Sequence, residues 1–230
     1  MLFLQQSRRL PYLVWQEVND SEYRMAKLEA PINALEHFLP EGTYKKIAFF
    51  FRDYPIHLSI THERSSVLGD YRNPARGEKV HRISINGTLN QYSFLITLLH
   101  ELAHMLTFIQ YKHTVMPHGA EWKQSFASLL SKFIGKNVFP PDVEIALQSS
   151  LNKITASTCS DPNLYRALKK YDRKGKATKL VEDVPFNTNF ETHDGRVFQK
   201  VEKLRTRFRC KEVKTGYIYL FPALAEVKMV

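Results

Sequence analysis

The sequence is poor in cysteine: Cys159 and Cys210 are the only two in 230 residues, and they form no C-x-x-C pair. This scarcity excludes a disulfide-rich secreted scaffold and gives no basis for a cysteine-ligated metal site. Low cysteine usage is typical of a protein in a reducing compartment. We therefore expect a cytoplasmic location.

Long hydrophobic runs are also lacking. The N-terminal apolar run from Leu10 to Trp15 contains Pro11 and is followed by Gln16 and Glu17. About six residues are too few for the apolar segment of a signal peptide, which needs about 7 to 15. No stretch reads as the roughly 20 apolar residues of a membrane span. The sequence therefore predicts no membrane partner.

No internal repeat is visible, and the bulk composition is ordinary, with 43% hydrophobic and 24% charged residues. These values are those of a soluble globular protein. A chain of 230 residues can form one domain with a substantial core, or one domain with a small appendage.

The apolar pattern divides the chain into three parts. Residues 1–24 show no sustained period and predict an N-terminal extension that is poorly ordered. Residues 25–172 mix helical patterns, the first at 25–39, with strand patterns. Residues 173–230 carry mainly strand patterns separated by turn residues such as Asp194-Gly195. The sequence thus predicts an α+β domain followed by a small β subdomain.

Positive charge is concentrated toward the C-terminus. The formal net charge is +10, yet residues 166–179 and 196–214 each carry a net +6, so the rest of the chain is slightly acidic. Aromatic residues alternate with the cations there, as they do on nucleic-acid-binding surfaces. A solvated charged surface would have the same composition. The candidate nucleic-acid contacts are Lys169, Lys170, Arg173, Lys174, Arg205, Arg207 and Arg209.

The strongest chemical signal is the peptide His100-Glu101-Leu102-Ala103-His104, an H-E-x-x-H motif. It lies inside a long apolar pattern at 92–110 that predicts a buried helix. Residues i and i+4 share one face of a helix, so both imidazoles can reach one ion. Two unpartnered histidines would each cost about 1–3 kcal/mol in such surroundings. The motif therefore predicts a single catalytic zinc ion per chain, with Glu101 as the general base.

A catalytic zinc site takes three protein ligands, so one more is needed. Thr107 and Gln110 stand where the metzincin pattern requires glycine and histidine, which excludes that class. His118 is favoured because it follows Pro117 and begins an amphipathic helix whose packing would fix its direction. Glu121 is the main competitor, and His113 is expected to be a bystander.

The quoted motifs resemble the SprT-like family, the bacterial relatives of the Spartan DNA–protein crosslink protease. The resemblance covers roughly residues 30–172, and H-E-L-A-H joined to His118-Gly119-Ala120-Glu121-Trp122 is its most specific part. It implies a zincin-like core, His118 as third ligand, and proteolysis of DNA-bound or DNA-crosslinked proteins. Many family members end in a cysteine-rich zinc ribbon. Only Cys210 is present in that region, so no second zinc is expected.

Two functions remain open on the sequence. The first is a zinc endopeptidase that holds its peptide on a sheet edge, either at His81–Asn86 or at Ser66–Tyr71. The second is a DNA-binding module on a zincin scaffold with little or no proteolysis. The presence of Glu101 favours the enzyme, because a scaffold needs no base there.

Overall fold

The computed structural model describes residues 12–15, 28–62, 67–153, 161–172 and 178–230. Within these ranges the chain is a mixed α+β protein. It divides into two compact units, Met1–Tyr171 and Asp172–Val230. The sequence pattern places the corresponding boundary after residue 172.

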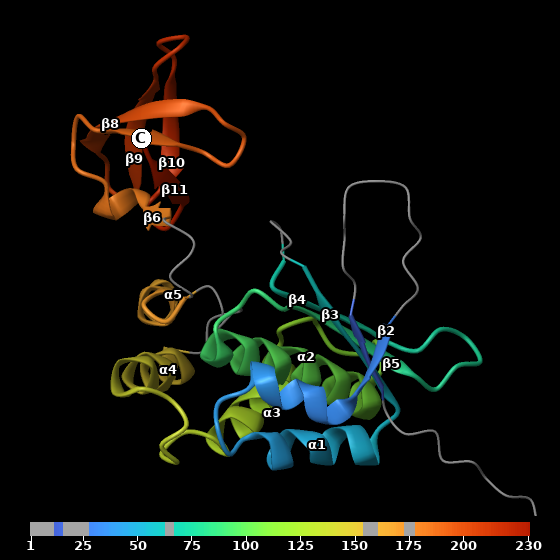
Figure 1. Ribbon diagram of the computed structural model, residues 1–230. Coiled ribbons are helices and arrows are strands. Elements are labelled where there is room, and N and C mark those ends of the chain that lie inside the picture. Colours follow the sequence, from blue (N-terminus) through green and yellow to red (C-terminus); the bar gives the residue numbers. More distant parts are fainter. Residues whose placement is uncertain (1–11, 16–27, 63–66, 154–160, 173–177) are drawn as a thin grey trace, which may run out of the picture. The chain divides into compact units, whose positions relative to one another are not determined.

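The first unit contains a five-stranded sheet with the order β2-β1-β3-β5-β4 (Figure 1). β1, β3 and β5 run parallel to one another, while β2 and β4 are antiparallel to their neighbours and form the two edges. In β5 the core residues Ile83 and Ile85 alternate with more exposed positions, as the period of two requires. The strands are β1 (Tyr12–Trp15), β2 (Leu28–Pro31), β3 (Ile56–Thr61), β4 (Gly69–Arg72) and β5 (His81–Asn86).

Helices complete the first unit, and the central one is α2 (Gln91–Tyr111). It contacts β4 and β5 of the sheet and also α3, so most of its surface is covered. The Asn90 side chain starts it by accepting hydrogen bonds from the Tyr92 and Ser93 amides. The others are the 3-10 helix η1 (Ile32–Phe38) and the α-helices α1 (Tyr44–Asp53), α3 (Ala120–Ser131), α4 (Pro141–Lys153) and α5 (Pro162–Lys169).

By length and composition alone, α2 could cross a membrane, which the reading of apolar runs did not anticipate. However, 61% of the most apolar 18-residue segment of α2 is buried inside the protein. Phe94, Leu98, Leu99 and Leu102 are all inaccessible to solvent. This burial is typical of the core helix of a globular domain, which also explains why α2 is so apolar.

β1 lies within the segment 1–24 that the sequence pattern treats as an extension. Four strand residues are too few to produce a detectable period, yet β1 pairs with β2 on one side and with β3 on the other. Deleting residues 1–24 should therefore remove both ladders that β1 forms and leave β2 without its partner. With each hydrogen bond worth about 0.5–1.5 kcal/mol, we expect the free energy of unfolding to fall by at least about 2 kcal/mol.

Denaturant unfolding of the full chain and of the truncated chain measures this loss. Deleting only residues 1–11 is the matched control, because it retains β1. Equal unfolding midpoints for the full chain and the 1–24 deletion would mean that β1 contributes nothing to stability.

The second unit is a six-stranded antiparallel sheet with the order β10-β9-β8-β7-β11-β6. Its own core contains Phe190, Phe198, Phe208 and the free thiol of Cys210. The strands are β6 (Thr178–Leu180), β7 (Asn189–Glu191), β8 (Val197–Lys203), β9 (Arg207–Glu212), β10 (Ile218–Pro222) and β11 (Glu226–Met229), with a short 3-10 helix η3 (Val181–Asp183).

Candidate metal centre

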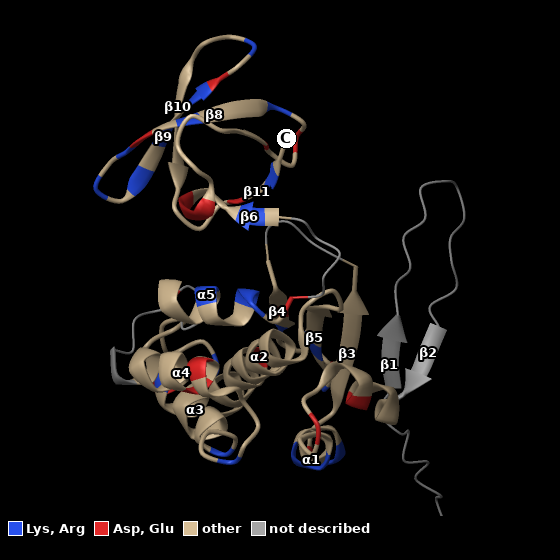
Figure 2. Ribbon diagram, turned by 60° about the vertical axis from the view of Figure 1, so that its left-hand side comes forward, with Lys and Arg blue, Asp and Glu red and all other residues tan. Residues whose placement is uncertain are grey.

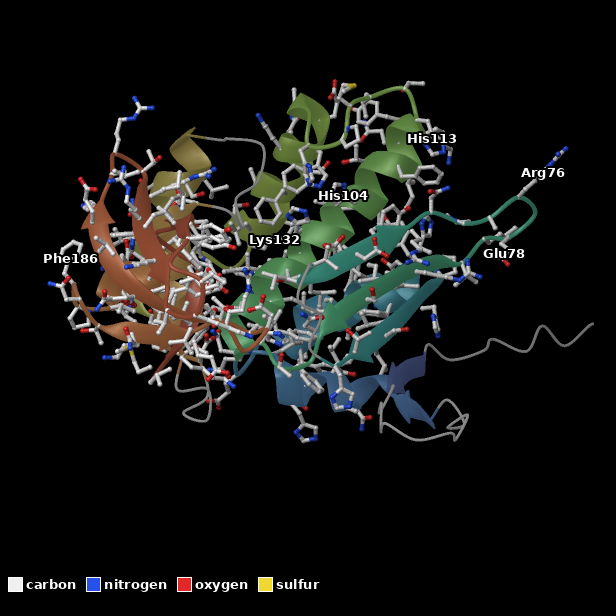
Figure 3. The ribbon with its side chains drawn as sticks, turned by 90° about the horizontal axis from the view of Figure 1, so that it is seen from above. Arg76, Glu78, His104, His113, Lys132 and Phe186 are labelled. Atoms are coloured by element: carbon white, nitrogen blue, oxygen red, sulfur yellow. The ribbon has the colours of Figure 1, made fainter. Side chains whose placement is uncertain are left out.

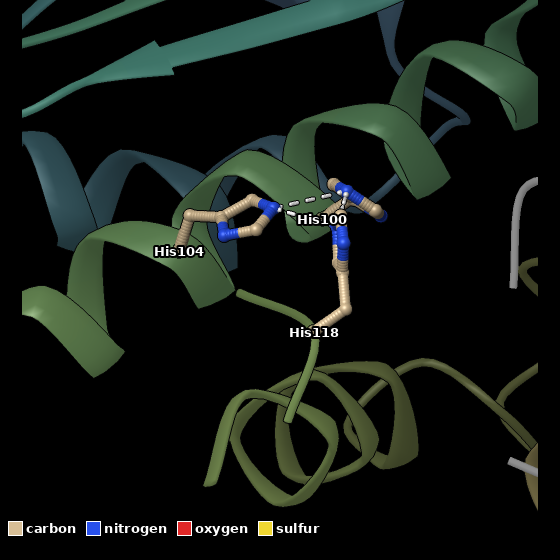
Figure 4. Close-up of side chains that lie close together, drawn as sticks. All are labelled: His100, His104 and His118. Atoms are coloured by element: carbon tan, nitrogen blue, oxygen red, sulfur yellow. Dashed lines mark hydrogen bonds between the residues drawn. The ribbon is translucent and has the colours of Figure 1, made fainter. Parts of the chain in front are cut away.

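Three histidine side chains converge beside α2 (Figure 4). The Nε2 atom of His104 lies 3.2 Å from that of His100 and 3.0 Å from that of His118, and the third pair is 3.1 Å apart. Among the described residues, this trio is the cluster of His, Cys, Asp or Glu whose donor atoms are close enough to share a metal ion. The structure thus brings together the three histidines selected from the sequence.

The spacing of the nitrogen atoms fits a tetrahedral metal. Zn–N bonds of about 2.0–2.1 Å at tetrahedral angles place the nitrogen atoms about 3.3–3.4 Å apart. The separations of 3.0–3.2 Å are only slightly shorter. The donor set therefore suits a small divalent cation and leaves a fourth coordination position for a non-protein ligand.

The electrostatics of the trio favour neutral imidazoles. Burial, and to a smaller extent the neighbouring His104 and His118, lower the pKa of His100 to about 3. Burial and then His118 lower the pKa of His104 to about 4, and burial also lowers the pKa of His118. At neutral pH each ring therefore keeps a lone pair that can bind a cation.

Local structure explains how each ligand reaches the centre. His100 and His104 are one helical turn apart on α2, so their rings extend from the same face. His118 precedes the N-cap of α3, Gly119, in a turn where the Gly119 amide donates to the Met116 carbonyl over 2.9 Å. Its φ of 57° is unusual for a residue other than glycine. Such strain is typical of functional positions, and here it turns the imidazole toward α2.

The other two candidate ligands lie elsewhere. Figure 3 shows His113 beyond the C-terminal end of α2, away from His104. His113 is exposed, and its ring packs on Phe108 with 5.2 Å between centroids. Glu121 lies in the first turn of α3 and does not belong to the cluster of donor atoms.

Glu101 is buried between α2 and the edge strand β4, with 5% of its surface exposed. The backbone of Gly69 in β4 comes so close that a Cβ atom there would lie 2.7 Å from Glu101 Oε1 and 2.7 Å from Thr97 Cγ2. The Glu101 carboxylate is therefore bounded by an edge strand of the sheet. Sequence reasoning missed this role of Gly69, since nothing in the motif indicates how closely β4 approaches.

The basic residues selected as nucleic-acid contacts are divided between the two units. Lys169 ends α5, and Lys170 follows it and pairs with Asp142 at 3.0 Å. Arg173 and Lys174 lie outside the described residues. Arg205 is exposed in the turn before β9, and Arg207 and Arg209 occupy alternate, exposed positions along that strand. Figure 2 shows segments of Lys and Arg in blue in the second unit.

The structure changes the set of basic side chains that are available to a polyanion. Lys200 contributes to the charge of residues 196–214, yet it is only 2% exposed and donates to the Glu182 and Val184 carbonyls at 3.0 and 2.6 Å. It is therefore not available to a polyanion. Lys211, absent from the sequence-based set, extends the exposed row of Arg207 and Arg209. Arg209 also pairs with Glu202 at 2.7 Å.

Comparison with known proteins agrees with the resemblance read from the motifs. The model of the SprT-like family matches residues 45–147, a segment that contains Glu101 and all three clustered histidines. Neither the curated proteins nor the solved structures contain a significant match. Over residues 45–147 the chain is therefore similar to the SprT-like family.

Proposed function

We propose that this protein is a zinc-dependent endopeptidase with a zincin-like catalytic domain, acting on proteins that are bound or crosslinked to DNA. The observation that carries the proposal is the convergence of three neutral Nε2 atoms to within 3.2 Å of one another, with Glu101 adjacent in sequence to the first ligand. The match of residues 45–147 to the SprT-like family supports a metalloprotease-like activity.

The roles follow from the positions of the side chains. His100, His104 and His118 would hold the ion, which supplies Lewis acidity that polarises the scissile carbonyl and makes water easier to deprotonate. Glu101 takes the proton from the attacking water and delivers it to the leaving amine. Burial beside β4 limits the orientations open to this carboxylate, so it is held ready for proton transfer.

A sheet edge supports peptide binding. Of the two strands considered from the sequence, β5 is flanked by β3 and β4, so its backbone has no free edge. β4 is an edge strand and passes directly over Glu101. An extended substrate pairing with β4 would bring its scissile bond close to the base and the histidines.

The metal content tests the first half of the proposal. We expect one zinc ion per chain by elemental analysis, and its loss in His100→Ala, His104→Ala and His118→Ala, because each substitution removes one of three ligands. His113→Ala is the matched control, since His113 is exposed and lies outside the cluster. Two tightly bound ions per chain, or full zinc retention in His118→Ala, would contradict this assignment of ligands.

DNA affinity tests the second half. Changing Arg205, Arg207 and Arg209 to glutamine should weaken binding and reduce the slope of log K against log salt by about 2–3, because about 0.7–0.9 counterions are released per phosphate contact. Zinc content should not change. Fluorescence anisotropy with single-stranded and double-stranded DNA of several sequences measures both affinity and slope, and little dependence on base sequence is expected.

The matched control for this surface changes three exposed cations of the first unit, Lys45, Arg76 and Lys136, to glutamine. It removes the same charge from the chain without altering β9. Equal losses in the two triple variants would mean that net charge alone attracts DNA. A cleavage rate that does not depend on DNA and is unchanged in both triple variants would indicate a zinc protease without the DNA-linked role.

A further inference from the structure

Trp122 packs against all three proposed metal-binding imidazoles and connects them to the core. It lies in α3, is 1% exposed, and stacks on Phe126 with ring planes 9° apart. Its ring centroid is 4.6 Å from that of His100, 4.6 Å from that of His118 and 5.2 Å from that of His104. One side chain thus contacts all three rings, although two come from α2 and one from the turn before α3.

The contact is on the rear of the cluster. The Nε2 atoms converge to 3.0–3.2 Å, whereas the ring centroids of the histidines are 4.6–5.1 Å apart. An ion would sit at the narrow end, within bonding distance of every Nε2. A bulky indole in contact with all three rings fits only at the wide end. It therefore forms a floor behind the imidazoles and leaves the narrow end open.

The indole nitrogen gives an independent indication that ring size matters here. Among the described residues, Trp122 Nε1 is the buried side-chain polar atom without a hydrogen-bond partner. Leaving such a donor unsatisfied costs about 1–3 kcal/mol. A phenyl ring would carry no such cost. The position therefore uses the area of the two-ring system, which reaches three imidazoles at once.

Rigid support of this kind raises metal affinity in addition to stabilising the fold. Metal-binding groups lose affinity when their supporting neighbours are altered, because free rotation of the ligands must then be restricted on binding. His118 has the greatest need of support, because its strained backbone lies in a loop rather than in a helix. Trp122, four residues later, packs directly against its ring.

We propose that Trp122 is a positioning residue of the metal centre, an indole floor that holds His100, His104 and His118 with their Nε2 atoms convergent. The role rests on the proposed zinc site. Trp122 itself does not bind the ion or touch substrate.

The test compares zinc affinity with stability in Trp122→Leu, Trp122→Phe and a matched control, Phe133→Leu. Phe133 is equally buried at 1% exposure, and its ring lies under the Lys46 ammonium group. Competition with a chromophoric chelator gives zinc affinity, and thermal unfolding of the metal-free proteins gives stability. We expect zinc affinity to fall about 10–100-fold in Trp122→Leu, less in Trp122→Phe, and to stay near the wild-type value in Phe133→Leu.

A second measurement separates positioning from general destabilisation. Cobalt(II) in the site has visible absorption bands that respond to ligand geometry, and they should shift or lose intensity in Trp122→Leu but not in Phe133→Leu. If Trp122→Leu does not fold, the zinc affinity and cobalt spectrum of Trp122→Phe are compared with those of the wild type instead. Unchanged affinity and spectrum in the folded Trp122 variants would overturn the positioning role and leave the zinc site intact. Absence of stoichiometric zinc from the wild-type chain would instead overturn the proposed function, and the positioning role with it.

Discussion

Glu101→Gln is expected to lower kcat for peptide cleavage by about 10²–10⁴-fold while leaving zinc content at one per chain. Glutamine has the shape of glutamate but cannot accept the proton of the attacking water. Because Glu101 is buried against β4 and the substitution is nearly isosteric, the fold and the histidine cluster should not change. The measurement is single-turnover cleavage of a DNA-binding protein, with zinc content determined on the same samples.

Glu121→Gln is the matched control for this substitution. Glu121 is a carboxylate in the first turn of α3, near the cluster in sequence but outside its set of donor atoms. It should retain activity. Cleavage by Glu101→Gln at the wild-type rate would remove Glu101 from the mechanism. A zinc-loaded wild-type chain that binds DNA without cleaving any protein would instead favour the DNA-binding module.

Elements with a long or strict apolar period were predictable from the sequence, and short ones were not. β5 has the predicted bounds, 81–86, and α2 extends one residue beyond the predicted 92–110 at each end. Where the structure describes the pattern at 25–39, it forms β2 followed by a 3-10 helix. Pro31 explains this difference, because the residue before a proline is disfavoured in helical geometry and Ala30 accordingly lies in a strand.

Some features of the candidate site were likewise predictable from the sequence, and others were not. The i, i+4 spacing of His100 and His104 is a local property of a helix, so the sequence determines that these rings share a face. The left-handed backbone of His118 and the contacts of Trp122 depend on how α3 packs against α2, which no local pattern encodes. Likewise, counting charges cannot distinguish Lys200, which is buried among carbonyls, from Arg207, which is exposed.

Gly69→Ala is expected to lower kcat of the folded protein by about 10²-fold with zinc retained, and to lower the melting temperature as well. The added Cβ would lie 2.7 Å from Glu101 Oε1, a distance that real Cβ contacts do not tolerate. The carboxylate of Glu101 is at the end of a flexible side chain and can move at low energetic cost. The buried Thr97 methyl group, also at 2.7 Å, must shift too, which accounts for the lower melting temperature. The base is then displaced, and a misplacement of about 1 Å can cost 10²-fold in rate.

Gly87→Ala separates this effect from simple crowding. A Cβ at Gly87 would be equally close to a neighbour, 2.7 Å from Ile60 Cγ2, but that neighbour belongs to the β3 core rather than to the base. It should lower the melting temperature and leave kcat of the folded fraction near the wild-type value. Comparing kcat, zinc content and melting temperature across the two variants tests whether β4 controls the orientation of Glu101. Wild-type kcat in Gly69→Ala would mean that the close approach of this strand does not position the base.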